Sequence, residues 1–264
     1  MLVKRLATGL VLGPLFVLAI LTLEPKYFNL LMMVILTLGA WEFSRLAKII
    51  DSYKRLFFVV TVVLIALFFR YSIGNMSWFL YALVFWWALN LYWVVSYPKH
   101  VDFWFGSMTR RLVNGVLLLV PMWLALVELR VDHGVEHVLL LLLIIWGADT
   151  GAYIIGRSFG KHKLAPNVSP GKSIEGALGG LVMGILVTLA FLYFQNTPSD
   201  KYWFYILLSL VVVLVSILGD LFESLYKRAS DIKDSSNLLP GHGGILDRFD
   251  SLSAAAPFFL LGMW

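Results

Sequence analysis

Long apolar runs recur along nearly the whole chain, and this feature most restricts what the chain can fold into. A helix that crosses a bilayer needs about 20 mainly apolar residues. Hydrophobic residues make up 60% of the chain and charged residues 14%. Soluble domains average about 45–50% and about 25% on a similar count. We therefore predict an all-α fold, a polytopic transmembrane helix bundle, and exclude a fold stable in water.

About eight of these runs are long enough to be candidate spans, and a shorter apolar segment, Ala254–Trp264, follows them at the C-terminus. The first run could be a signal peptide, but it lacks a small-residue cleavage site, so we interpret it as a retained helix. The eight runs are Leu6–Leu23, Phe28–Leu46, Leu56–Phe69, Trp78–Tyr97, Leu112–Leu129, Val138–Ile155, Gly176–Phe194 and Tyr202–Gly219.

The basic residues predict an orientation for this bundle, because short segments rich in Lys and Arg stay in the cytoplasm. The N-terminus and every second connection hold 17 of the 21 basic residues. The alternate connections hold only Lys26, Arg70, Arg130 and Lys201. We therefore expect a cytoplasmic N-terminus. The 17 are Lys4, Arg5, Arg45, Lys48, Lys54, Arg55, Lys99, Arg110, Arg111, Arg157, Lys161, Lys163, Lys172, Lys227, Arg228, Lys233 and Arg248.

Two polar segments, 149–180 and 220–253, interrupt the apolar pattern on the predicted cytoplasmic side. We therefore divide the chain into N-terminal helices at 1–137 (about five spans) and a catalytic region at 138–264. The chain has no cysteine, which excludes disulfides, a thiol nucleophile and a cysteine-based zinc site. The net charge of +5 fits anionic lipid headgroups better than nucleic acid in such a chain, so we expect no nucleic-acid partner.

The first polar segment combines a carboxylate with a basic, glycine-rich stretch. Asp149 lies at or near the end of the sixth candidate span, where a carboxylate is costly and usually faces a polar cavity; a structural hydrogen bond between helices is the alternative. Ser169 and Pro170 predict a helix start, with free N–H groups that would bind a phosphate together with Lys172 and Ser173. A basic loop that contacts lipid headgroups is the alternative. The Walker spacing is absent, so an ATP site of that type is unsupported.

The second polar segment predicts a metal-and-phosphate site. If the eighth helix continues to Arg228, then Asp220, Glu223, Ser224 and Lys227 share one face. Carboxylates at its membrane end could hold Mg²⁺, with Lys227 and Arg228 holding phosphates. A glycine-rich turn at 240–244 then delivers a second acidic pair, Asp247 and Asp250, one helical turn apart. Asp149, Glu223 and Ser224 could line a polar cavity beside them. The predicted phosphate-binding set is Lys172, Ser173, Lys227, Arg228, Lys233 and His242.

The pattern of this segment resembles the signature of the phosphatidate cytidylyltransferases (CDP-diacylglycerol synthases). It reads Ser224-x2-Lys227-Arg228-x4-Lys233-Asp234-x-Ser236-x2-Leu239-Pro240-Gly241-His242-Gly243-Gly244-x2-Asp247-Arg248-x-Asp250. One departure is Tyr226, where an aliphatic residue or Phe is usual. The first polar segment is also similar to the family's upstream region, so the resemblance covers roughly Trp146 to the C-terminus. The N-terminal half agrees only in being polytopic.

The resemblance implies that the phosphate of phosphatidate attacks CTP, releasing pyrophosphate and leaving CDP-diacylglycerol. It also implies Mg²⁺ dependence, with Asp220 and Asp247 at the metal and Lys227 and Arg228 at phosphate, so we expect Asp220, Asp247, Lys227 and Asp250 to be the catalytic residues. The predicted location is the inner (cytoplasmic) membrane, with the active site facing the cytoplasm. A second, monovalent cation and a homodimer are both compatible with the sequence, which determines neither.

Three other functions compete with this interpretation. Another enzyme that joins a nucleotide to a lipid, such as an isoprenoid-lipid cytidylyltransferase, would have a similar catalytic segment. The CDP-alcohol phosphotransferases are less well supported because their Asp-Gly-x2-Ala-Arg core is absent. An ion-coupled transporter would use Asp149 and Asp220 as ion sites within the membrane. The gathering of acidic and basic groups on one side of the bundle favours the enzyme.

Overall fold

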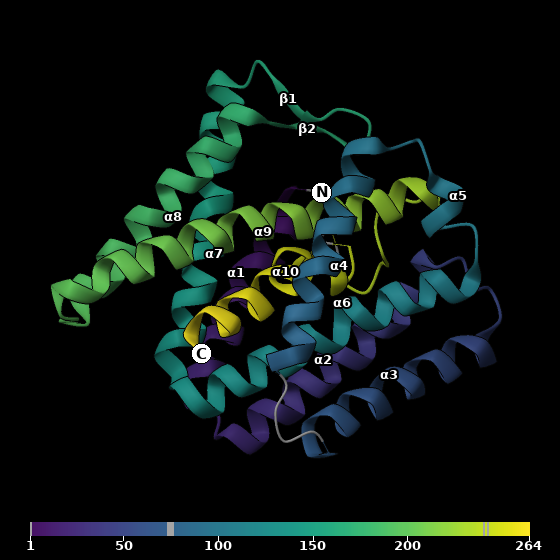
Figure 1. Cartoon of the computed structure of the whole chain (residues 1–264), viewed down its shortest axis with the longest axis horizontal. Coiled ribbons are helices and arrows are strands. Elements are labelled where there is room, and N and C mark those ends of the chain that lie inside the picture. The colour runs from purple at the N-terminus through teal and green to yellow at the C-terminus, as the bar shows by residue number, and fades with distance from the viewer. Residues whose placement is uncertain (1, 73–76, 240, 242) are drawn as a thin grey trace.

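The computed structural model describes residues 2–72, 77–239, 241 and 243–264. Within these ranges the fold is helical, which confirms the all-α prediction, and one short β-hairpin is added (Figure 1). The helices are α1 (Leu2–Thr22), α2 (Pro25–Leu46), α3 (Ser52–Ser72), α4 (Ser77–Ser96), α5 (Val101–Trp104), α6 (Met108–Glu128), α7 (Gly134–Phe159), α8 (Ile174–Phe194), α9 (Tyr202–Ala229) and α10 (Leu246–Met263). A π-helical turn, Leu129–His133, joins α6 to α7, and a 3₁₀ turn, Ser199–Lys201, precedes α9.

Within the described part of the chain, five helical segments are long and apolar enough to cross a membrane: 25–46, 52–71, 108–159, 174–194 and 199–229. The third contains both α6 and α7, and shorter apolar helices cover 11–22 and 81–96. On α8, Leu178, Val182 and Leu186 are each more than half exposed and recur every four residues. Such an apolar stripe suits contact with lipid. The arrangement is that of an integral membrane protein, while the predicted count of eight spans stays a prediction.

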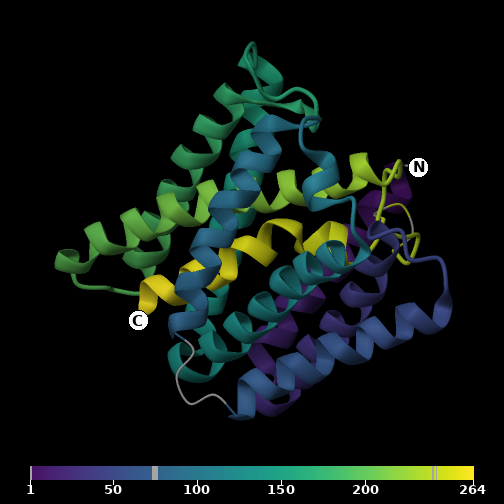
Figure 2. The ribbon, with the colours of Figure 1, turned by 45° about the vertical axis from the view of Figure 1, so that its right-hand side comes forward.

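The C-terminal helix α10 lies in the middle of the bundle in both ribbon views (Figures 1 and 2). It begins at Leu246, eight residues before the apolar segment that the sequence suggests, and packs against α9, α6, α4, α7 and α2. Its small residues Ala254, Ala255 and Ala256 are fully buried. Small side chains let neighbouring backbones approach closely, which explains how a helix of modest hydrophobicity occupies the centre.

The prediction of a helix start at Ser169 and Pro170 is wrong. Residues Ser169–Ser173 form strand β2, which pairs antiparallel with β1 (Lys163–Ala165). Helix α8 begins only at Ile174, whose N–H still donates to the His162 carbonyl of the hairpin. Ser173 is the actual N-cap, because its Oγ accepts a hydrogen bond from the Gly176 N–H at 3.1 Å. The backbone of residues 169–173 is therefore paired in the hairpin rather than in a helix.

Candidate active site between two antiparallel helices

The predicted site residues of the second polar segment meet along a seam between α9 and α10. Gly219 of α9 packs on α10 so closely that an added Cβ would lie 2.6 Å from the Asp250 carbonyl. Eight residues later on α9, Lys227 contacts Asp247, which precedes Asp250 on α10. The two helices are therefore antiparallel. Helix α9 extends to Ala229, which meets the condition that the helix continues to Arg228, so the face that carries Asp220 and Lys227 borders the acidic start of α10.

Lys227 joins the two helices electrostatically. Its ammonium lies 2.5 Å from Asp247 Oδ1 and 2.8 Å from Glu223 Oε1. The Glu223 side chain is only 2% exposed, that of Asp247 6% and that of Lys227 17%. A buried carboxylate without a partner is strongly destabilising, so Lys227 offsets the burial of two acidic groups. The ammonium predicted to bind phosphate is therefore already shared by two carboxylates.

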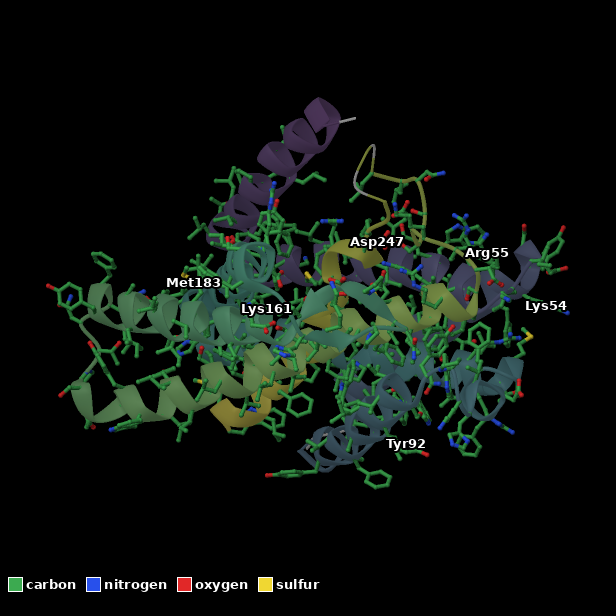
Figure 3. All side chains as sticks on the ribbon, turned by 90° about the horizontal axis from the view of Figure 1, so that it is seen from above. Lys54, Arg55, Tyr92, Lys161, Met183 and Asp247 are labelled. Carbon is green, nitrogen blue, oxygen red and sulfur yellow. The ribbon has the colours of Figure 1, made fainter. Side chains whose placement is uncertain are left out.

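Asp247, labelled in Figure 3, lies at the start of α10, and its second oxygen organises the connection between α9 and α10. Oδ2 accepts hydrogen bonds from Ser235 N (3.0 Å), Ser235 Oγ (2.8 Å) and Gly244 N (2.6 Å). Burial by itself raises the pKa of Asp247, but hydrogen bonds and the Lys227 ammonium outweigh it and lower this pKa to about 2. Asp247 is therefore an ionised group held in a fixed position.

Asp220 lies at a second cluster, one to two turns along α9 from Lys227. Its Oδ2 is 2.6 Å from Lys172 Nζ, and its Oδ1 accepts a hydrogen bond from Ser224 Oγ at 3.2 Å. Lys172 belongs to β2, so the hairpin places a positively charged side chain beside Asp220 of α9. The structure thus brings the two predicted polar segments together.

A cavity of about 440 Å³ opens at this cluster between α7, α8, α9 and the hairpin. Charged groups gather in part of its lining, and the remainder is mostly apolar or glycine. The charged lining residues are Asp149, Arg157, Lys172 and Asp220, and the aliphatic ones include Ala148, Leu164, Ala177, Val213 and Ile217. Such a lining suits a ligand that has an anionic head and an apolar body.

Negative charge exceeds positive charge among the described groups of this site. Burial and the Asp220 carboxylate raise the pKa of Asp250 to about 7, although the Ser251 N–H lowers it. Asp149 interacts electrostatically with Lys172, Asp220 and Arg248. Counted as ionised groups, five carboxylates face four cationic groups, a formal excess of one negative charge: Asp149, Asp220, Glu223, Asp247 and Asp250 against Arg157, Lys172, Lys227 and Arg248.

This excess fits a divalent cation. Among the described residues, no three His, Asp or Glu side chains approach closely enough to form a complete metal site. Mg²⁺ needs no such cage, because it is usually held by one or two carboxylates, substrate phosphates and water. These carboxylates are compatible with an open Mg²⁺ site, in which the substrate would supply the remaining oxygens.

Four other predicted site residues have different surroundings. Ser173 is buried and caps α8, although it also lines the cavity. Arg228 Nε donates to the Val168 carbonyl at 3.1 Å and so fixes the hairpin tip. Lys233 is exposed in the connection after α9. His242 lies outside the described residues.

The sequence analysis missed two residues of this site. Glu42 of α2 is 2% exposed and accepts four hydrogen bonds from residues 235–246. A carboxylate inside an apolar run is a recognisable signal of function, but Glu42 lies far from the polar segments in sequence. Arg157, in the first polar segment, lines the cavity and also went unassigned.

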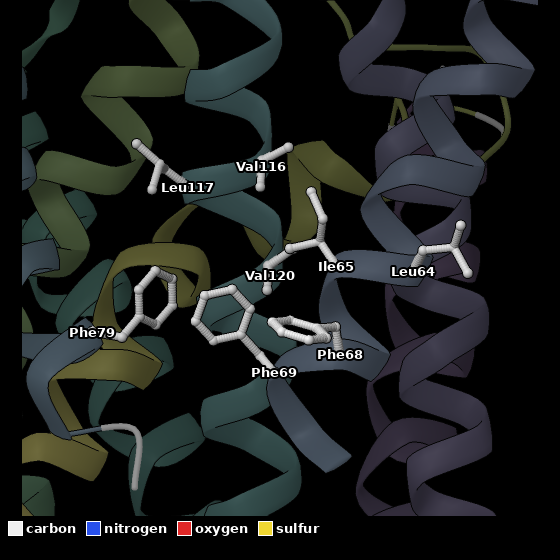
Figure 4. A pocket seen from close by; sticks show the side chains of 8 residues that line it. All are labelled: Leu64, Ile65, Phe68, Phe69, Phe79, Val116, Leu117 and Val120. Atoms are coloured by element: carbon white, nitrogen blue, oxygen red, sulfur yellow. The ribbon is translucent and has the colours of Figure 1, made fainter. Parts of the chain in front are cut away.

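A different cavity, of about 520 Å³, lies between α3, α4 and α6 (Figure 4). Its described lining residues are all apolar; Phe68, Phe69, Val116 and Val120 are among them. It offers no partner for a phosphate, so the polar cavity at Asp220 remains the candidate site.

Comparison with known proteins identifies the family. The model of the cytidylyltransferase family matches residues 3–264. The chain belongs to the cytidylyltransferase family. A protein of Pseudomonas aeruginosa named phosphatidate cytidylyltransferase is 44% identical over 100% of this chain and 97% of its own length. One of the same name from Haemophilus influenzae is 39% identical over 98% of this chain and 97% of its own.

The cytidylyltransferase match extends the resemblance that the sequence motifs carry. Those motifs relate only the part from about Trp146 onward to the family, whereas the family model also covers α1 to α6. The family match therefore covers the N-terminal helices as well as the two polar segments.

Proposed function

We propose that the chain is a phosphatidate cytidylyltransferase, which transfers CMP from CTP to phosphatidate and releases pyrophosphate. The observation that carries this proposal is its similarity, over nearly the full length of both chains, to proteins of that name. The cavity at Asp220 supports it independently, because it combines charged and apolar walls as a phospholipid substrate requires.

In this proposal the cavity between α7, α8 and α9 binds phosphatidate. Lys172 and Arg157 hold its phosphate, and the acyl chains follow the apolar wall that includes Val213 and Ile217 toward the lipid. The phosphate monoester is already an anion, so it needs no strong general base to attack the α-phosphorus of CTP. Phosphoryl-type transfer depends mainly on positioning and on neutralising charge. The residues at this cavity provide both.

The nucleotide would bind on the cytoplasmic side of the seam. Lys227, Arg228, Lys233 and His242 are the predicted contacts to the CTP phosphates, with Ser173 beside Lys172. Asp220 and Asp247 would hold Mg²⁺, with Asp250 between the two helices as a further carboxylate. When bound, Mg²⁺ supplies charge neutralisation for the two anionic substrates. A second, monovalent cation is tested by adding K⁺ or Na⁺ to the same assay.

Contacts between connections support the predicted orientation. The segments expected in the cytoplasm contact one another: Lys48 pairs with Asp231 at 3.3 Å, and Asn167 donates to the Tyr97 carbonyl. Segments expected outside also contact one another, as Arg130 donates to the Leu23 carbonyl. We propose that the chain spans the inner membrane eight times, with the N-terminus and the site on the cytoplasmic side. We also propose that residues 1–137 and 138–264 differ in function, the second part carrying the catalytic residues.

The absence of cysteine makes the orientation directly testable. Tyr53 lies in a predicted cytoplasmic connection and Asp200 in an outer one, and both are exposed. In intact spheroplasts, a membrane-impermeant maleimide should label the Asp200→Cys protein and spare the Tyr53→Cys protein until the cells are opened. The reverse pattern would contradict the orientation. Cross-linking of the purified protein in lipid nanodiscs tests whether the chain forms a homodimer.

The enzymatic proposal is tested with purified protein in liposomes. Radiolabelled CTP and phosphatidate with Mg²⁺ should yield lipid-linked CMP and free pyrophosphate in equal amounts. The same assay with an isoprenoid phosphate in place of phosphatidate tests the rival function of an isoprenoid-lipid cytidylyltransferase. We expect no product from the isoprenoid phosphate. The absence of lipid-linked CMP from phosphatidate would refute the proposed function.

A further inference from the structure

The buried carboxylate of Glu42 lies outside every motif of the chain, yet it contacts the catalytic connection at four points. Its Oε1 accepts hydrogen bonds from Ser236 Oγ (2.6 Å) and Ile245 N (3.0 Å). Its Oε2 accepts a hydrogen bond from Leu246 N (2.7 Å) and lies 3.1 Å from Ser235 Oγ, which shares its single hydroxyl proton between Glu42 and Asp247. Each carboxylate oxygen therefore binds one serine hydroxyl and one backbone N–H. These contacts use about four lone-pair positions, which is all that a carboxylate offers.

These contacts link Glu42 to Asp247 through a single residue. Ser235 Oγ lies within hydrogen-bond distance of both Glu42 Oε2 (3.1 Å) and Asp247 Oδ2 (2.8 Å). Ile245 and Leu246 immediately precede Asp247, and Leu246 is the first residue of α10. A negative charge is favourable at a helix N-terminus, where backbone N–H groups lack partners. Glu42 thus fixes both the start of α10 and the serine that holds Asp247.

The backbone at Gly244 packs directly against this contact. A Cβ added at Gly244 would clash with both Ser235 Oγ and the Glu42 carboxylate. On the far side, Arg45 of α2 donates to the Ser235 carbonyl at 3.4 Å. The Glu42 carboxylate and the Arg45 guanidinium, one turn apart on α2, therefore both bind the connection at Ser235.

We propose that Glu42 is a positioning residue that holds the 235–246 connection so that Asp247 meets the substrates in a fixed place. The inference deepens the proposed cytidylyl transfer and rests on it. It assigns the N-terminal half a part in the reaction. Outer hydrogen-bond partners of functional carboxylates typically affect metal affinity or activity by about 10–100-fold. We expect a decrease of that size in kcat when the Glu42 carboxylate is replaced.

Two substitutions distinguish positioning from simple filling of space. Gln has the size of Glu, but one of its two acceptors becomes an NH₂ donor, which leaves either Ile245 N or Leu246 N without a partner. Asp is one methylene shorter but keeps both oxygens. The proposal predicts that Glu42→Asp retains more kcat than Glu42→Gln. If space filling were the role, Glu42→Gln would be the better variant, and that order would overturn the proposal.

The kinetic test uses the full-length protein in liposomes. Glu42→Gln should lower kcat about 10–100-fold and raise the Mg²⁺ concentration at half-maximal rate. The KM for phosphatidate should stay within about twofold, because α2 does not line the lipid cavity. The matched control is Glu24→Gln, an exposed carboxylate just before the same helix, which should keep wild-type kinetics. An unchanged kcat in Glu42→Gln would refute the inference.

A second measurement does not depend on catalysis. Hydrogen–deuterium exchange should be faster in peptides covering 235–246 of Glu42→Gln than in the wild type, and unchanged in peptides from α8. Unchanged exchange in 235–246 would overturn the proposal. If the wild-type protein forms no lipid-linked CMP, the proposed function fails, while the exchange result still decides whether Glu42 holds the connection.

Discussion

Removal of the Lys227 ammonium should destabilise the protein and inactivate it for the same reason. Its Nζ lies between Glu223 Oε1 and Asp247 Oδ1, at 2.8 and 2.5 Å. Replacement by Met keeps most of the apolar stem and deletes the charge. Breaking a buried ion pair by removing one partner costs about 3–5 kcal/mol, because a charge is left buried and unpaired. Since 17% of the Lys227 side chain is still exposed, we expect about 3 kcal/mol, at the lower end of that range.

The assay is equilibrium unfolding of the detergent-solubilised protein, measured on Lys227→Met beside a matched control. The control is Lys48→Met, which breaks the pair with Asp231 at 3.3 Å. There the side chains are 43% and 88% exposed, and exposed pairs contribute only about 0–1 kcal/mol. The two substitutions are chemically identical, but Lys227 has two buried carboxylate partners whereas Lys48 has one exposed partner.

A double mutant tests the cause. Adding Glu223→Gln to Lys227→Met removes one of the two orphaned carboxylates, so part of the lost stability should return. Coupling between contacting residues is typically about 0.5–3 kcal/mol. Activity should not return, because Asp247 still lacks its cation. The reasoning is refuted if Lys227→Met unfolds like Lys48→Met, or if Glu223→Gln restores no stability.

Three further predictions follow from the site. Gly244→Ala should destabilise the protein by about 1–3 kcal/mol through overpacking against Ser235, whereas Gly171→Ala, where no atom lies within 4 Å of an added Cβ, should leave thermal unfolding unchanged. Asp220→Asn should lower kcat about 10²–10³-fold, as loss of one preorganised charge does elsewhere; a rate within twofold of wild type would exclude Asp220 from the reaction. Excess EDTA should abolish formation of lipid-linked CMP and added Mg²⁺ should restore it, and activity that persists in EDTA would contradict the metal proposal.

The sequence predicted those parts of the site that follow from local periodicity. Asp220, Glu223, Ser224 and Lys227 share a face because a helix repeats every 3.6 residues, and α9 has that periodicity through Ala229. Asp247 and Asp250 likewise begin a helix after the glycine-rich turn. Hydropathy located the apolar helices, but it does not determine how many of them cross the membrane.

The failures arose where distant segments decide local structure. Ser169 and Pro170 have the composition of a helix start, yet pairing with Lys163–Ala165 makes them a strand. Lys227 seemed free to bind phosphate because its partner Asp247 is 20 positions away. Glu42 was missed because its partners begin 193 positions later. Periodicity reports neighbours along one helix and says nothing about contacts between helices.

Tyr226 illustrates how the two halves of the chain compensate each other. It is the one departure noted from the family pattern, and its hydroxyl would be costly in a core where the side chain is fully buried. The hydroxyl accepts a hydrogen bond from Asn114 Nδ2 at 2.8 Å, and Asn114 Oδ1 accepts one from Trp86 Nε1 at 3.0 Å. Phe at this position would leave the buried Asn114 amide without that acceptor. The unusual residue on α9 therefore depends on α6 and α4, just as Asp247 on α10 depends on Glu42 of α2. The N-terminal helices thus contact the seam between α9 and α10 at two separate points, and the family match covers both halves of the chain.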